Sequence, residues 1–152
     1  MKIATDTARL VIYDLDQLRH RIEDDSEWWT AEESVLQEIN HGNAMFICLE
    51  EDGLYDININ PSPPDDFEYD DLIVANIKNS SGQFFIGPAE AVTAEGEEPE
   101  EGKYGHFFEA SPGDYELIIK AEEHSLSIWI DTIEKFEVNK FQEIPSLEEW
   151  EE

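Results

Sequence analysis

The side chains that could do chemistry in this sequence are above all carboxylates. Asp and Glu number 38 against 9 Lys and Arg, which gives a formal net charge of -29 with neutral histidines. The 56 positions from Ile22 to Ile77 hold 16 of these acids and no Lys or Arg. Such a surface attracts basic partners and repels nucleic-acid phosphates and anionic membranes. We therefore predict a basic protein as partner, with no direct binding to nucleic acid or membrane; the alternative is acidity for solubility alone.

Two acidic segments carry aromatic side chains among their carboxylates. The loop Asp65–Asp71 reads DDFEYDD, and the turn Glu50–Asp52 precedes Tyr55. Aromatics can fill pockets at the centre of an interface while the carboxylates orient the partner. The predicted partner-binding residues are Glu50, Glu51, Asp52, Tyr55, Asp65, Asp66, Phe67, Glu68, Tyr69, Asp70 and Asp71. The loop Glu95–Gly102 is a competing site, disfavoured because its expected flexibility would cost entropy on binding.

A pair of adjacent tryptophans, Trp28 and Trp29, offers a different chemistry. In a strand the two side chains would point to opposite faces, so one could be core and the other half exposed. An exposed indole, or Tyr69, could stack on a sugar. The alternative function is therefore a small-ligand module, such as a carbohydrate-binding jelly roll.

Motifs for catalysis and for metal binding are missing. The four histidines are scattered, with no HxH or HExxH spacing, although a jelly roll can gather distant histidines. The acidic loop Asp65–Asp71 lacks the spacing of a calcium loop. The lone Cys48 lies in an apolar run and excludes a disulfide framework, so we expect a small buried side chain. No nucleophile elbow or phosphate-binding glycine loop is present. We predict a protein that is not an enzyme and has no metal or cofactor.

The stretch from Asn40 to Asn60 predicts two paired strands. Ala44–Leu49 is an unbroken apolar run, and Leu54–Ile59 alternates between apolar and polar side chains. Asp52-Gly53 between them is typical of a tight hairpin turn. Two strands alone are marginal in water, so another sheet or a helix must cover their apolar face.

Helical spacing occurs in the N-terminal part of the chain. Asp14–Asp25 places Leu15, Leu18 and Ile22 on one side of a short helix. Residues 30–40 begin with a possible capping box and continue with a helical apolar stripe, although an outer strand is the alternative. We also expect Arg19, His20 and Arg21 to pair with carboxylates elsewhere.

From Leu72 onward, short strands alternate with turns. The expected strands are residues 72–77, 83–87, 104–110, 115–122, 126–131 and 133–138. With the earlier strands this makes eight or nine, which predicts one mainly β domain over residues 1–152, a β-sandwich or jelly roll with one or two short helices near the N-terminus. The acidic loop 95–102 should be flexible, and 146–152 forms an acidic tail. The predicted core is Val11, Ile12, Phe46, Ile47, Leu49, Ile57, Ile73, Phe85, Phe107, Leu117, Ile119, Ile128 and Ile130.

The first residues give no sign of a targeting segment. Asp6 and Arg9 interrupt the apolar core that a signal peptide needs. No apolar run approaches the roughly 18 residues required to span a bilayer. We expect a cytoplasmic protein.

Five strings within residues 5–120 belong together: DTARLVIYD, LRHRIEDDSEWW, INHGNAMFICLEEDGLYDI, SSGQFFIGPAEAVTAEG and SPGDYEL. They resemble a family of small, acidic, uncharacterised bacterial proteins found in interbacterial toxin neighbourhoods. The resemblance implies an immunity-type role and transfers no site residues. It agrees with the charge argument, because an acidic domain can block a basic toxin or nuclease by complementarity. We predict a stoichiometric inhibitor of a basic protein; a second alternative is an inhibitor that mimics nucleic acid.

Overall fold

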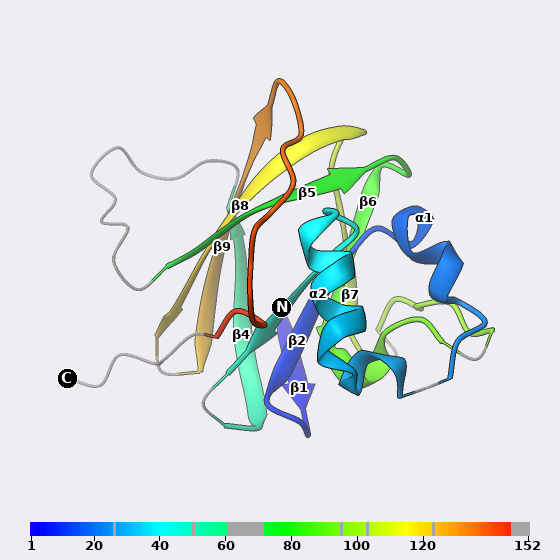
Figure 1. The fold of residues 1–152 in the computed structure, drawn as a ribbon. Helices are drawn as coiled ribbons and strands as arrows, with labels where there is room; N and C mark the ends of the chain where they lie inside the picture. Colours follow the sequence, from blue (N-terminus) through cyan, green and yellow to red (C-terminus); the bar gives the residue numbers. More distant parts are fainter. Residues whose placement is uncertain are drawn as a thin grey trace.

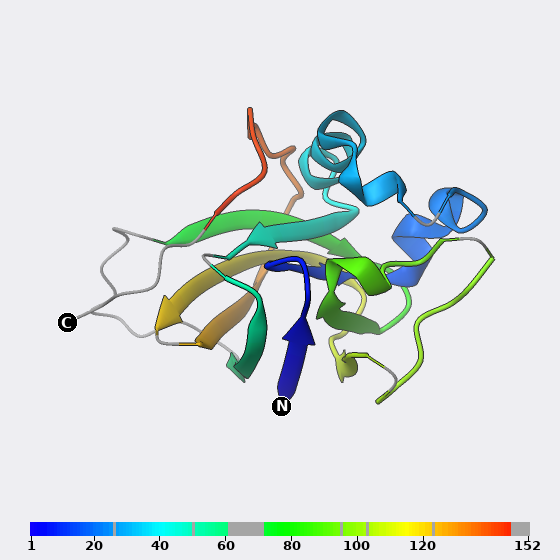
Figure 2. The same ribbon diagram turned by 90° about the horizontal axis from the view of Figure 1, so that it is seen from below.

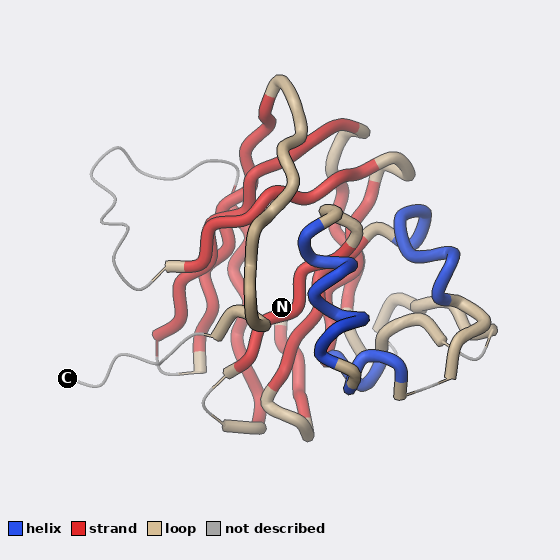
Figure 3. Tube along the Cα trace, in the orientation of Figure 1, coloured by secondary structure: helices blue, strands red, loops and turns tan. Residues whose placement is uncertain are grey.

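The computed structural model shows two β-sheets packed face to face (Figures 1 and 3). It describes residues 1–25, 27–49, 51–60, 72–94, 96–102, 104–122 and 124–146. In sheet order, the five-stranded first sheet contains β1 (Lys2–Thr5), β4 (Gly53–Asn60), β9 (Ser125–Ile133), β8 (Gly113–Glu122) and β5 (Ile73–Asn79). The four-stranded second sheet contains β3 (Ala44–Cys48), β2 (Arg9–Tyr13), β6 (Gln83–Pro88) and β7 (His106–Glu109). The predicted β-sandwich is confirmed.

Alternating side chains of both sheets build the core between them. Along β4, Tyr55 and Ile57 are buried while Leu54 and Asp56 face outward, as the period-2 pattern predicts. Of the predicted core residues, Phe107 and Ile130 are half-buried and the others are buried. The sandwich therefore follows from the local apolar pattern of its strands.

The helix α2 covers part of the outer face of the second sheet. The described helices are α1 (Leu15–Leu18), η1 (Arg19–Arg21), η2 (Trp28–Thr30), α2 (Glu32–Asn40) and η3 (Ala89–Ala91), where η marks a 3-10 helix. Figure 2 shows α2 lying over the sheet, and the buried Val35 and Ile39 face β3. This cover explains why β2 and β3 read as continuous apolar runs, since both of their faces exclude water.

The predicted hairpin across Asp52-Gly53 is wrong. β3 pairs with β2 in the second sheet, whereas β4 lies between β1 and β9 in the first sheet. The segment that joins β3 to β4 is therefore a crossover between sheets. Gly53 still has a positive φ of 140°, a conformation that glycine can supply in a hairpin turn and in a crossover alike. The sequence therefore predicts the unusual backbone conformation at Gly53 correctly, but it predicts the wrong partner strand for β3 and β4.

The helix predictions hold with two changes. Residues 32–40 form α2, so the predicted helix is confirmed and the strand alternative is wrong. The N-cap is Ala31, and the Thr30 hydroxyl donates to the Glu27 carbonyl at 2.7 Å instead of capping α2. The helix expected from residue 14 to residue 25 has only α1 and η1. The Asp14 carboxylate caps the start of α1 by accepting the Asp16 amide at 3.1 Å. It also accepts the amides of Ser80 and Ser81 in the β5–β6 turn.

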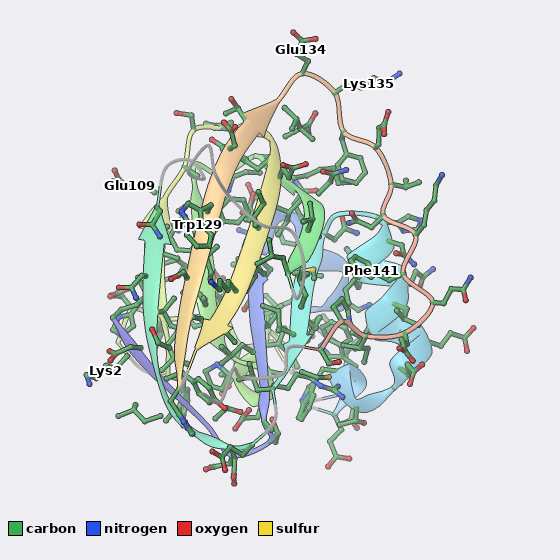
Figure 4. The ribbon with its side chains drawn as sticks, turned by 90° about the vertical axis from the view of Figure 1, so that its left-hand side faces the viewer. Lys2, Glu109, Trp129, Glu134, Lys135 and Phe141 are labelled. Atoms are coloured by element: carbon green, nitrogen blue, oxygen red, sulfur yellow. The ribbon has the colours of Figure 1, made fainter. Side chains whose placement is uncertain are left out.

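Residues 134–146 form an irregular strap, which replaces the strand predicted at 133–138. The Asn139 side chain accepts the Asn76 amide of β5 at 2.8 Å and donates to the Ile39 carbonyl of α2 at 2.8 Å. Further along, the Pro145 carbonyl accepts the Cys48 amide of β3 at 2.8 Å, and Cys48 is half-buried where full burial was expected. The strap therefore joins edge strands of both sheets and passes α2, beside which Figure 4 places Phe141.

Candidate functional site

The predicted acidic segments attach to opposite ends of β4. Glu51 and Asp52 precede its first residue, and Asn60 and Leu72 flank the loop 61–71. At a rise of about 3.3 Å per residue, the eight residues of β4 place its two ends about 23 Å apart. Glu50, Asp65, Asp66, Phe67, Glu68, Tyr69, Asp70 and Asp71 lie outside the described residues. Their predicted role in binding a partner stays a prediction.

Tyr55 does not contribute an exposed aromatic surface. Its residue is fully buried, and its hydroxyl donates to the Glu51 carbonyl at 2.6 Å. The ring of His124 stacks on it at 4.8 Å, and His124 Nε2 lies 3.0 Å from Glu51 Oε1. Tyr55 and His124 therefore support the acidic turn from inside. His124 has a positive φ of 62°. The contact of His124 with Tyr55 and Glu51 could not be predicted from the sequence, because only the position of His124 in the short β8–β9 turn indicates this conformation.

The two tryptophans lie in η2, not in a strand. Trp28 is buried, with Phe46 edge-on to its ring at 5.9 Å and the Arg21 guanidinium 5.0 Å from the ring centroid. Trp29 is half-buried, and Arg9 lies 5.7 Å from its centroid. The expectation that one indole is core and the other partly exposed is correct. An arginine lies over each indole, and Trp28 is buried. Trp28 therefore offers no exposed ring on which a sugar could stack.

A cluster of exposed carboxylates is brought together by two segments far apart in sequence. Trp28 Nε1 donates to the Thr93 carbonyl at 2.9 Å, and the Gly96 amide donates to the Ile22 carbonyl at 2.5 Å. Figures 1 and 2 show the loop after β6 lying beside the segment after α1. We call this surface the acidic face. Its exposed carboxylates are Glu23, Asp25, Glu27, Glu32, Glu33, Glu97, Glu98, Glu100 and Glu101.

The basic residues next to the acidic face are already paired inside the protein. Arg21 Nε lies 3.1 Å from Glu38 Oε2 and its Nη1 lies 3.0 Å from Asp24. His20 Nε2 is 2.7 Å from the same Glu38, and Asn43 donates to it at 2.9 Å. Burial raises the pKa of Glu38, but the hydrogen bonds from Asn43, His20 and Arg21 outweigh burial and lower it. The expected pairing of these basic residues with carboxylates is confirmed.

A pocket of about 320 Å³ opens at one edge of the acidic face. It is lined by Phe85, Glu90, Ala91, Val92, Ala94, Glu97, Glu98, Pro99, Glu100 and Tyr104. Gly105 lets β6 pass close beneath it, since a Cβ there would collide with the Ile86 carbonyl oxygen and the Phe85 ring. The pocket therefore combines apolar walls with a carboxylate rim.

Two glutamates near this pocket form hydrogen bonds to neighbouring elements. Glu90 accepts the Asp6 amide at 2.6 Å and the Thr7 hydroxyl at 2.8 Å. At the other end, Glu101 accepts the Phe107 amide at 2.6 Å. That backbone hydrogen bond, with a second from His106, lowers the pKa of Glu101. Glu90 is thus bonded to the β1–β2 turn and Glu101 to β7, while the flexibility expected for residues 95–102 stays a prediction.

A second cavity, of about 520 Å³, lies at the end of the first sheet next to Asn60. Glu109 and Asp131 contribute carboxylates, and Ile59, Tyr115 and Ile130 contribute apolar walls. Asn60 is the last described residue before the loop predicted to bind a partner. Two carboxylates line this cavity, against four in the pocket on the acidic face.

The described residues form neither a metal site nor a membrane-spanning helix. Across residues 1–146, apart from the positions the structure leaves undescribed, no group of three or more His, Cys, Asp and Glu could hold a metal ion. His20, His106 and His124 each lie against a carboxylate instead. Within the same residues, the helices are too short and too polar to cross a membrane.

Comparison with known proteins identifies similar folds and a family. A protein described as crocagin biosynthetic gene J aligns with a TM-score of 0.60 and 13% identity, over 89% of this chain and 96% of that chain. ComJ from Bacillus subtilis, described as an inhibitor of the DNA-degrading activity of NucA, aligns with a TM-score of 0.47 and 12% identity, over 86% and 91%. No curated protein matches the sequence significantly. Residues 1–145 match DUF6386, a family of unknown function, and the chain belongs to that family.

Proposed function

We propose that this protein is a stoichiometric binding protein that neutralises a basic protein partner, and that the partner is a bacterial toxin. The acidic face carries the proposal: nine exposed carboxylates lie on segments 22–33 and 89–102, and neither segment contains a Lys or Arg. The toxin is the class of partner implied by the resemblance to proteins of interbacterial toxin neighbourhoods. A basic protein approaching this surface would be steered by charge and held by complementary ion pairs.

The internal bonding of the acidic face supports binding without large rearrangement. Trp28 is buried and hydrogen-bonded to Thr93, and Thr93 in turn donates through its hydroxyl to the Glu97 carbonyl at 2.5 Å. The carboxylates therefore project from a surface whose backbone is tied to the core. A pre-ordered surface loses less conformational entropy on association than a mobile loop does.

The turn at Glu51 and Asp52, with the loop Asp65–Asp71, is a second proposed contact surface. Its two parts attach to opposite ends of β4, so a partner that touched both would span the first sheet. The acidic face and this second surface lead to different mutational outcomes, which allows one experiment to separate them.

The test begins with co-purification of the partner from the native host and its identification by mass spectrometry. Association rates are then measured by stopped-flow fluorescence at low and at physiological salt, for wild type and for three variants that each lose four charges. The acidic-face variant changes Glu23, Glu27, Glu97 and Glu98 to Gln. The loop variant changes Asp65, Asp66, Asp70 and Asp71 to Asn. The control changes the exposed Glu109, Glu134, Glu137 and Glu143 to Gln.

We expect the acidic-face variant to associate about tenfold more slowly at low salt, because local charge steers encounter. The control should change the rate less than about threefold, since it removes the same charge at a distance from the contact. If only the loop variant is slowed, the second surface is the contact and the acidic face is not. If wild-type association does not depend on salt, the charge-driven function itself is wrong.

A further inference from the structure

The pocket on the acidic face has the chemistry of a receptor for one planar cation. Its walls include Phe85, Val92 and Ala94, all buried, and its opening is bordered by Tyr104, which is 63% exposed. Glu97 and Glu98 are exposed at the rim, and among the described residues no basic side chain forms an ion pair with either. A ligand that fits must therefore be positively charged and also have an apolar or flat body.

An arginine side chain meets these requirements better than a lysine does. The guanidinium group is planar, stacks on aromatic rings and donates to carboxylates in a fork, while its three methylenes can lie along apolar walls. A lysine ammonium is a strongly hydrated point charge that stacks poorly. Bare metal ions fit badly, because half of the residues that line the pocket have no side-chain oxygen to bind one.

The size of the pocket suits a small occupant. Sites for drug-sized ligands run from about 300 to 1,000 Å³, and this pocket, at about 320 Å³, is at the lower end. We propose that the pocket receives one arginine of the basic protein partner, as the central anchor of the interface. The inference rests on the proposed function, and arginines filling pockets are common energetic anchors of interfaces.

The surroundings of the pocket keep it open in the free protein. Val92 donates its amide to the Ala89 carbonyl at 3.0 Å to close η3, and the Thr93 amide donates to the buried Tyr13 hydroxyl at 3.2 Å. Glu90 holds η3 against the β1–β2 turn. An arginine would therefore enter a site that already has its shape, which lowers the entropy cost of binding.

The test measures fluorescence anisotropy of labelled nona-arginine and nona-lysine peptides with the full chain. Ala91, a half-buried residue of the pocket wall, is replaced by Trp to fill the space without changing charge. The matched control is Ala31→Trp, which adds the same side chain to an exposed position on the acidic face. Tyr104→Ala, at a mostly exposed position, tests the aromatic wall independently. Near-ultraviolet circular dichroism and thermal unfolding confirm that each variant is folded.

We expect wild type to bind nona-arginine at least about threefold more tightly than nona-lysine at physiological salt. Ala91→Trp should weaken nona-arginine binding about tenfold and remove the preference for arginine, because the anchoring pocket is filled. Tyr104→Ala should reduce the same preference. Ala31→Trp should leave the affinity for both peptides within about twofold, since its charge field is unchanged.

Two results would overturn the inference while leaving the proposed function intact. One is equal binding of the two peptides by wild type; the other is equal loss of affinity in Ala91→Trp and Ala31→Trp. Either would mean that the acidic face acts as a diffuse field without a specific anchor. A different result, no binding of either peptide even at low salt, would overturn the charge-driven function itself and the anchor with it.

Discussion

Replacing Glu38 by glutamine should destabilise the fold by about 2–3 kcal/mol at neutral pH. The Glu38 side chain is 3% exposed and accepts hydrogen bonds from Asn43, His20 and Arg21. Glutamine has the same shape, but its NH₂ group must face at least one of these donors. Losing a hydrogen bond to a charged group costs about 1.5–3 kcal/mol, and removing one partner of a fully buried ion pair costs about 3–5.

The expected loss of stability in Glu38→Gln lies toward the lower of these costs, because the partners of Glu38 keep other contacts. Arg21 retains Asp24 at 3.0 Å, and the His20 side chain is 52% exposed and can be hydrated. Differential scanning calorimetry should show a decrease in Tm of about 5–10 °C, given about 2–4 °C per kcal/mol for a chain of this size. The matched control is Glu33→Gln, an exposed residue of the same helix, which should cost less than about 1 kcal/mol through the helix dipole.

The difference in unfolding free energy between wild type and Glu38→Gln should decrease as the pH falls. The folded state lowers the pKa of Glu38, so its stabilising effect is complete above the ordinary Glu pKa of about 4.3 and is lost as the pH falls through the lower, folded pKa. Urea unfolding at several pH values should therefore show the two proteins converging in acid. A loss below about 0.5 kcal/mol at neutral pH, or a gap that widens on acidification, would refute this account of the cluster.

Three further changes have defined outcomes. Gly42→Ala should cost about 1–3 kcal/mol in urea unfolding, because Gly42 has a φ of 73° and a Cβ there would collide with Phe136 of the strap. Trp28→Phe should cost about 1–3 kcal/mol by leaving the Thr93 carbonyl unpaired, and hydrogen exchange should rise around Thr93; unchanged exchange there would contradict it. Burial raises the pKa of Tyr13 far above the ordinary value, so tyrosinate absorbance should show that Tyr13 ionises only when alkali unfolds the protein.

The identity of most strands could be predicted from the sequence, because period-2 alternation and apolar runs are local properties. Their pairing could not. The signal Asp52-Gly53 is the same for a hairpin and for a crossover between sheets, and nothing near β4 indicates that Asp56 aligns with Ser125. The alternation at 133–138 resembles a strand, but Phe136 packs on Gly42 and the segment becomes the strap.

The acidic face could be predicted only in part for the same reason. The charge of segments 22–33 and 89–102 is plain in the sequence, whereas their proximity depends on the bond between Trp28 and Thr93, which are 65 positions apart. The pocket between η3 and Tyr104 is lined by residues spread from Phe85 to Tyr104, so no short motif marks it. Tyr55 was assigned to the surface because its neighbours are acidic, but the alternation of β4 turns it inward.

The order of strands in the first sheet determines how the chain can fold. β4 pairs in parallel with β9, with Asp56 beside Ser125, and β1 pairs only with β4 among the described strands. During synthesis β1 and β4 can therefore join the rest of the first sheet only after residues 125–133 have emerged, because β9 lies between them and β8. Chains dominated by such distant pairings fold slowly, in about milliseconds to seconds. Mutual repulsion among the carboxylates would keep the waiting chain from aggregating, so the acidity that defines the surface also protects the protein before that surface exists.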